Sequence, residues 1–248
     1  MGVRDRLFRI YWRLERRVAP GLEYAQARYE RMLFNVVRPG SHWLDLGCGH
    51  TLLPKWRAKT EAQLVHVPGQ LAGVDPDLGA LRKNLSMRRR VCADCSALPF
   101  TDKSFDVVTA NMVVEHLRCP GTQFAEVCRV LRHGGRFLFH TPNAWAYPTV
   151  FVRLVPDFMK SWGARLLEGR AERDRYRTFY RANTVGTIGR LARENGFVVS
   201  SIEFVRSTAL FAMVPPLAVV ELAWLRALAR SSLHRLRSNL IVVLERAA

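Results

Sequence analysis

Residues 43–50 read Trp43-Leu44-Asp45-Leu46-Gly47-Cys48-Gly49-His50. A short apolar run here ends in an acid and two closely spaced glycines, which predicts a strand that enters a tight turn. Gly47 and Gly49 permit backbone angles closed to other residues and leave no Cβ in the way, so a small molecule can lie against the chain. Asp45 adds a carboxylate at the mouth of the turn. A nicotinamide-binding turn would have a third glycine where Leu52 stands, so the pattern favours a cationic ligand over a pyrophosphate.

Strand-like and helix-like patterns alternate along the rest of the chain. Apolar runs with strand character follow at residues 71–75, 90–93, 105–110, 136–140, 197–204 and 239–244. Helical patterns occupy residues 52–59, 77–87, 122–131 and 183–195, and residues 60–70 are expected to be a loop insertion. This alternation predicts parallel βαβ units and therefore an α/β fold. A length of 248 residues favours one domain with insertions over two small domains.

The order of the motifs resembles one enzyme family. Asp45-Leu46-Gly47-Cys48-Gly49 is similar to the first motif of class I S-adenosylmethionine-dependent methyltransferases. The segment 93–100 resembles the adenine segment of that family, and Gly134-Gly135 resembles the turn before its fifth strand. Residues 43–143 together are similar to the small-molecule branch that includes ubiquinone and menaquinone biosynthesis methyltransferases. The resemblance implies a Rossmann-like sheet of seven mostly parallel strands with helices on both faces, and S-adenosylmethionine as cofactor, with S-adenosylhomocysteine as product.

The resemblance also implies roles for individual residues. The two glycines would admit the methionine and ribose portions, and Asp45 would accept from the ammonium group. Asp75 would accept from both ribose hydroxyls, although a strand-end Asp can instead be a helix cap. Asp94 would accept from the exocyclic amine of adenine. The predicted cofactor-binding set is Asp45, Gly47, Cys48, Gly49, Asp75, Pro76, Asp94, Cys95, Ser96 and Asn111.

Methyl transfer is a direct displacement, so the protein mainly aligns the reacting groups and excludes water. A hydroxyl nucleophile also benefits from a base, and His116 is the first candidate because the free pKa of histidine lies near neutrality. The alternative is that Glu115-His116 only orders its loop; His140 is the second candidate. In the quinone-ring O-methyltransferases that this segment resembles, an additional Glu that would help to bind a divalent ion stands where this chain has Met112. No metal site is therefore expected.

The expected layout of the single domain, 1–248, is an N-terminal helical extension (1–38), a cofactor-binding core (39–143), an insertion (144–182) and a C-terminal part (183–248) with a second insertion (208–238). Residues 5–36 are predicted to be a basic helix interrupted at Pro20 and Gly21, which either packs on the domain edge, covers the cofactor or lies on a membrane. The apolar run 209–220 is too short to span a bilayer. With the arginines that follow it, this run either lies on a membrane surface, covers the substrate pocket or forms a dimer contact.

The net charge of +17 comes almost wholly from arginine. Such a charge attracts nucleic acid or anionic lipid, or it reflects a genomic preference for arginine codons. No RNA-binding signature accompanies the arginines, so nucleic acid is disfavoured.

The predicted function is therefore methylation, favoured at oxygen, of a small-molecule or lipid-like acceptor. The alternatives are a non-catalytic methyltransferase-like binding subunit and, less favoured, an RNA methyltransferase. Five cysteines in no even set suggest reduced thiols. We expect a cytoplasmic protein, peripheral on the inner face of the membrane, that can form a homodimer.

Overall fold

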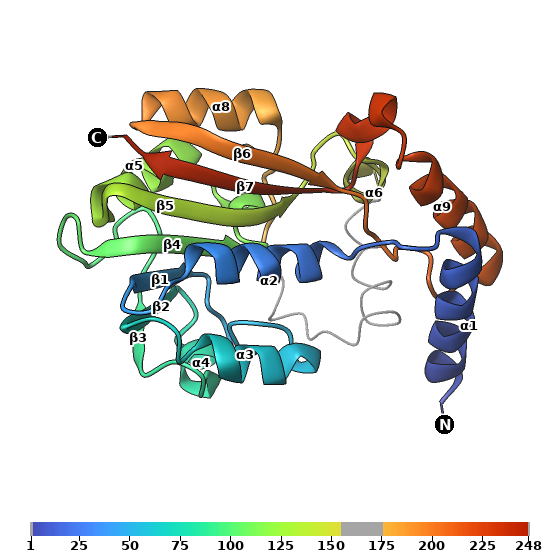
Figure 1. Cartoon of the computed structure of the whole chain (residues 1–248), viewed down its shortest axis with the longest axis horizontal. Coiled ribbons are helices and arrows are strands. Elements are labelled where there is room, and N and C mark those ends of the chain that lie inside the picture. Colours follow the sequence, from blue (N-terminus) through green and yellow to red (C-terminus); the bar gives the residue numbers. More distant parts are fainter. Residues whose placement is uncertain (1, 155–175, 248) are drawn as a thin grey trace. The chain divides into compact units, whose positions relative to one another are not determined.

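The computed structural model describes residues 2–154 and 176–247 and contains a seven-stranded sheet of order β3-β2-β1-β4-β5-β7-β6 (Figure 1). The strands are β1 (His42–Leu46), β2 (Gln70–Asp75), β3 (Arg89–Cys92), β4 (Phe105–Asn111), β5 (Leu131–Pro142), β6 (Phe197–Val205) and β7 (Asn239–Arg246). Neighbouring strands from β3 to β5 are parallel. The arrow of β7 runs opposite to those of β5 and β6 in Figure 1. The predicted seven-stranded, mostly parallel sheet is confirmed.

Helices connect and flank these strands. They are α1 (Val3–Val18), α2 (Ala25–Val36), α3 (Ala58–Leu64), α4 (Leu78–Lys83), α5 (Pro120–Val130), α6 (Tyr147–Leu154), α8 (Val185–Glu194) and α9 (Pro215–Ala227), with 3₁₀ turns η1 (Lys55–Arg57), η2 (Val114–His116) and η4 (Ser231–Leu236). The predicted N-terminal helical extension is confirmed as α1 and α2, with the interruption at Pro20 and Gly21 between them.

The side chains of the central strands show that helices cover both faces of the sheet. Successive residues of a strand point to opposite faces. Phe124 of α5 packs edge-on against Phe137 and Phe139 of β5. His140, the next residue of β5, points to the other face, where its ring lies 5.9 Å from that of Tyr29 in α2. α2 and α5 therefore lie on opposite faces.

The first crossover helix lies later in the chain than predicted. The expected helix at 52–59 is wrong, because α3 begins at Ala58 and continues into the region expected to be a loop. Leu52 and Leu53 are buried in the turn before it, and the Leu53 N–H donates to Glu61 Oε2 at 2.7 Å. Pro54 has an extended backbone. Burial of the two leucines and the bond to Glu61 thus override the helical pattern.

Contacts divide the chain into two compact units. Unit 1 comprises Met1–Ala27, Pro142–Arg177 and Phe204–Leu240, and unit 2 comprises Arg28–Thr141, Thr178–Glu203 and Ile241–Ala248. Unit 2 holds most of the sheet. In unit 1, α1 packs along α9 (Figure 1). Their shared core consists of Tyr11, Ala19, Leu22, Ala212, Ala218, Leu222, Leu225 and Leu228.

Candidate functional site

The strand register gathers the predicted site residues at the carboxyl edge of the sheet. Leu46, the last residue of β1, pairs with Val74 of β2 and with Ala110 of β4. Asn111 at the end of β4 pairs with His140 of β5. Carboxyl ends of parallel strands meet at one edge, where open α/β sheets bind ligands. The glycine turn, Asp75, Asn111 and His140 therefore share this edge.

The glycine turn is fastened to the end of β2. Both the Gly47 and the Cys48 N–H donate to the Val74 carbonyl, at 2.7 and 3.1 Å. Gly47 has a φ of +65°, and a Cβ there would lie 2.4 Å from Val113 Cγ2. Gly49 has a φ of +45°, and the nearest atom to a Cβ there would be the Gly47 carbonyl oxygen at 3.9 Å. Gly47 is thus required by packing, whereas the space beside Gly49 is open to a ligand.

Asp75 is a buried carboxylate oriented by two backbone donors. Its Oδ2 accepts from the Gly49 N–H at 2.9 Å, and its Oδ1 accepts from the Asp77 N–H at 2.8 Å. The side chain of Asp77, not of Asp75, caps α4 by accepting from the N–H groups of Gly79 and Ala80. The helix-cap alternative for Asp75 is therefore wrong. Each carboxylate oxygen has a second lone pair, so Asp75 can still accept from a diol.

Asp45 lies beneath the turn rather than at its mouth. The residue is 4% exposed, and its Oδ1 accepts from Thr109 Oγ1 at 2.5 Å. Thr109 in turn accepts from Trp43 Nε1 at 2.7 Å. Burial raises the pKa of Asp45 to about 7, and the nearby carboxylates of Asp75 and Glu61 also raise it. The charge of Asp45 is therefore sensitive to pH near neutrality.

The two predicted cysteines face the protein interior. A Cβ on Gly73 would lie 2.6 Å from Cys48 Sγ, so the thiol packs against β2. Burial raises the pKa of the Cys48 thiol well above its usual range and that of Cys95 to about 12. Neither thiol is a reactive thiolate at neutral pH. Cys48 and Cys95 can serve a ligand through their backbone only.

The predicted adenine segment forms a turn built on Asp94. Asp94 is exposed, and its Oδ1 accepts from the Ser96 N–H at 2.7 Å. The backbone N–H of Ser96, a residue of the predicted cofactor-binding set, thus already donates to Asp94. Pro76, which follows Asp75, is exposed, and its carbonyl accepts from the Cys92 thiol at 3.5 Å.

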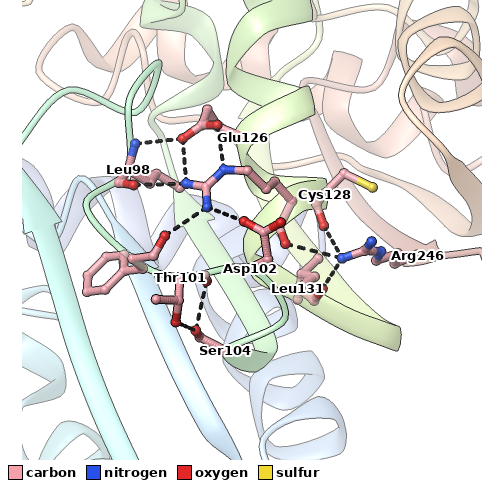
Figure 2. Close-up of polar contacts among 10 residues, drawn as sticks. Leu98, Thr101, Asp102, Ser104, Glu126, Cys128, Leu131 and Arg246 are labelled. Carbon is pink, nitrogen blue, oxygen red and sulfur yellow. Dashed lines mark hydrogen bonds and ion pairs between the residues drawn. The ribbon is translucent and has the colours of Figure 1, made fainter.

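Arg129 of α5 holds the loop that follows this turn. Figure 2 shows Leu98, Asp102 and Glu126 within this network of polar contacts. The guanidinium donates to the carbonyls of Leu98 and Phe100 and to Asp102 Oδ1, at 2.9, 2.8 and 2.8 Å. Glu126 accepts from the same guanidinium and, through Oε2, from the Leu98 N–H at 2.8 Å. Both backbone groups of Leu98 are therefore bound by one ion pair, which fixes the chain directly after the adenine segment.

Asn111 and His140 form a polar pair at the ends of β4 and β5. His140 Nδ1 lies 2.9 Å from Asn111 Oδ1. Because an amide oxygen only accepts, Nδ1 is the donor in this contact. His140 is 5% exposed. Met112, next to this pair, has a φ of +58°.

Glu115 joins the loop after β4 to β5 and to residues 179–180. Its Oε2 accepts from Thr141 Oγ1 at 2.9 Å, and its carbonyl accepts from the Phe179 and Tyr180 N–H groups. Burial raises the pKa of Glu115 to about 7. His116 Nε2 lies 4.0 Å from Glu115 Oε1, and its side chain is 28% exposed. Glu115 thus orders this loop, while His116 reaches the surface beside it.

Three buried residues of the site were not predicted. Asn84 Nδ2 donates to the carbonyls of Cys48 and Gly49, at 3.1 and 3.2 Å, and so holds the glycine turn from α4. α4 ends at Lys83, and Asn84 already has an extended backbone, which corrects the predicted helix 77–87. Thr109 donates to Asp45, and the Tyr29 ring lies tilted against the His140 ring. The sequence pattern gives no signal for Thr109 or Tyr29, because it does not show which strands pair or which helix packs on which face of the sheet.

Within the described residues, no three His, Cys, Asp or Glu side chains gather as a metal site. The arrangement does suit a nucleoside with a cationic tail, since an oriented carboxylate, an open glycine position and the exposed Asp94 lie at or next to one sheet edge.

The comparisons with known proteins agree with this arrangement. Residues 44–139 match a protein-family model described as Methyltransferase domain. The chain is 32% identical over 125 residues to malonyl-[acyl-carrier protein] O-methyltransferase of Legionella pneumophila, covering 48% of this chain and 42% of the relative. It is 34% identical over 116 residues to demethylmenaquinone methyltransferase of Symbiobacterium thermophilum, covering 41% and 42%. It is 35% identical over 101 residues to fatty-acid O-methyltransferase of Mycolicibacterium smegmatis, covering 40% and 36%.

A solved structure gives the same result for the fold. The S-adenosylmethionine-dependent methyltransferase of Mesorhizobium loti superimposes with a TM-score of 0.55 at 20% identity, covering 90% of this chain and 98% of that one. The predicted resemblance to S-adenosylmethionine-dependent methyltransferases and the Rossmann-like fold are therefore confirmed. This chain spans less than half of the length of the three sequence relatives named above.

Proposed function

We propose that this chain is an S-adenosylmethionine-dependent methyltransferase that acts on a small or lipid-like acceptor. The observation that carries the proposal is the Asp75 carboxylate, held at the end of β2 by the Gly49 and Asp77 N–H groups beside the open face of the glycine turn. A buried carboxylate held in this way accepts from a pair of vicinal hydroxyls with little reorganisation.

The residues that would hold the cofactor are those at the carboxyl edge. Asp75 would bind the ribose hydroxyls, the turn at Gly47 and Gly49 would admit the methionine portion, and Asp94 would accept from the adenine amine. Asp45, beneath the turn, would favour the positive charge of the ammonium group. The cofactor would supply a methyl group on a sulfonium, which is an excellent leaving group.

Oxygen is the proposed methylated atom. Two of the relatives are named as O-methyltransferases, of malonyl-[acyl-carrier protein] and of fatty acids, whereas the name demethylmenaquinone methyltransferase specifies no methylated atom. Carbon and nitrogen are the competing sites. We propose His116 as the base for a hydroxyl acceptor, because it is more exposed than His140 and lies 4.0 Å from Glu115. His140 is the second candidate.

The proposed compartment is the cytoplasm. All five cysteines are free thiols, as a reducing compartment maintains them. The homodimer remains a prediction.

Labelled cofactor tests the proposal. Incubation with S-adenosylmethionine that carries a labelled methyl group, in an extract of small molecules and lipids, should move the label into a fraction that organic solvent recovers. His116→Gln should lower kcat about 10²–10⁴-fold for a hydroxyl acceptor. His133→Gln is the control and should leave kcat unchanged, because His133 lies near the start of β5, away from the carboxyl edge of the sheet.

In a parallel incubation to which total cellular RNA is added, label in RNA alone would contradict the proposal. Tight cofactor binding without transfer to any fraction would instead favour the non-catalytic subunit.

A further inference from the structure

α9 is apolar on its exposed side as well as on its buried side. Its inner side chains, Ala218, Leu222 and Leu225, are fully buried in the core of unit 1. Its outer side chains include Leu217, Val219, Val220 and Trp224, which are 46%, 40%, 67% and 36% exposed. A helix that faces water on one side normally carries polar residues there.

The exposed side chains of α9 form a continuous stripe rather than scattered contacts with water. Leu217, Val220 and Trp224 have the i, i+3, i+7 spacing that places side chains on one line of a helix. Phe211, just before α9, packs edge-on against Phe151 of α6 at 5.7 Å, and Phe151 is itself 45% exposed. Several large apolar side chains exposed along one line of a helix mark an interaction site.

The acid within α9 is turned away from this stripe. Glu221 is 3% exposed, and its carboxylate accepts from the Leu210 and Phe211 N–H groups at 3.1 Å each. The Tyr147 hydroxyl also donates to it. The other charged residue of α9 is Arg226, whose guanidinium reaches the Val18 carbonyl at the end of α1. The exposed face of α9 therefore carries no negative charge.

α1, which packs along α9 within the same unit, supplies a dense positive charge. Its exposed arginines are Arg4, Arg6, Arg9, Arg13, Arg16 and Arg17. The inner side of α1 is apolar, since Phe8, Leu14 and Val18 pack on the shared core. One helix of the pair is thus basic on its outer side, and the other is apolar.

We infer that the α1–α9 pair is a docking surface for an anionic lipid bilayer, independent of methyl transfer. The apolar stripe would enter the boundary between headgroups and acyl chains, and the arginines would bind lipid phosphates, as interfacial helices do. A second copy of the chain fits less well, because a two-fold contact through this face would bring two sets of α1 arginines together. No helix of residues 2–154 and 176–247 is long and apolar enough to cross a membrane.

Vesicle flotation of the full chain tests the inference. The protein should float with vesicles of phosphatidylcholine and phosphatidylglycerol and not with phosphatidylcholine alone. Val220→Glu/Trp224→Glu should weaken binding by at least about tenfold, because two apolar side chains no longer leave water. Arg9→Gln/Arg13→Gln should weaken it by about fivefold for each arginine removed.

Matched changes in unit 2 serve as controls. Leu85→Glu/Val198→Glu alters two exposed apolar residues, and Arg82→Gln/Arg88→Gln removes the same charge; both should float like the unaltered protein. Circular dichroism melting identifies any variant that fails to fold. Absence of flotation by the unaltered protein, or equal loss in the control variants, would overturn the inference. So would a dimer in light scattering that Val220→Glu/Trp224→Glu separates, without vesicle binding, since the stripe would then be a contact between copies.

Discussion

Asp45 is the residue at which the chemistry of the site depends most directly on pH. Burial raises its pKa to about 7, so that near neutrality the folded protein holds this carboxyl partly protonated. The ionised form suits a cationic ligand. The affinity for S-adenosylmethionine should therefore rise with pH up to about 7 and then level off. Binding near neutrality should also release a proton from Asp45, which calorimetry detects when it is repeated in buffers of different ionisation enthalpy.

The same shift has a consequence for stability. Between pH 3.8 and about 7 the folded chain holds a proton on Asp45 that the unfolded chain has lost. Since the native state then binds more protons, the free energy of unfolding falls as pH rises through this window. Asp45→Asn should remove this part of the pH dependence in chemical denaturation and should also remove the proton release. An unchanged pH profile in Asp45→Asn would show that the carboxyl is ionised throughout.

At the scale of elements, the loop after the adenine segment depends on one helix. Arg129 and Glu126 of α5 bind both backbone groups of Leu98 (Figure 2). Arg129→Ala should free this loop and weaken the discrimination between S-adenosylhomocysteine and its inosine analogue, which differ at the exocyclic amine that Asp94 would bind. Arg132→Ala is the matched control, because Arg132 holds Asp106 at the start of β4 instead. Equal discrimination in both variants would contradict this role for Arg129.

The strands could be predicted from the sequence more closely than the first helices. Alternating apolar runs predicted the seven strands, because burial acts locally there. The predicted turn at Gly134-Gly135 is wrong, since both glycines lie within β5, which begins at Leu131 and shifts its register against β4 there. The start of α3 depends on two features that periodicity does not reveal. Leu52 and Leu53 are buried, and the Leu53 N–H donates to the side chain of Glu61. Asn84 after α4 could have been taken as a helix-terminating residue, but its bonds to the glycine turn depend on the fold.

At the scale of the whole molecule, the segments that match no family motif fall mainly in one compact unit. Residues 1–38, 144–182 and 208–238 could be set apart from the core by sequence alone, and they overlap the three segments of unit 1. Periodicity did not show that α1 and α9 would share a core, because periodicity is a local signal and 196 residues lie between Val18 and Pro215. The proposed cofactor site and the proposed lipid-docking surface thus belong to different units, and each can be tested while the other is intact.

The central claim is that Asp75 binds the ribose of S-adenosylmethionine. Calorimetry should show that Asp75→Ala weakens the affinity for S-adenosylmethionine and S-adenosylhomocysteine by about 1–3 kcal/mol, the cost of lost hydrogen bonds to a charged group. Asp77→Ala is the matched control: it removes a carboxylate that also accepts from two backbone N–H groups, but only as a helix cap, so it should lower stability by about 1 kcal/mol and leave the affinity unchanged. Equal affinities in Asp75→Ala and the unaltered protein, or no cofactor binding by either, would contradict the account.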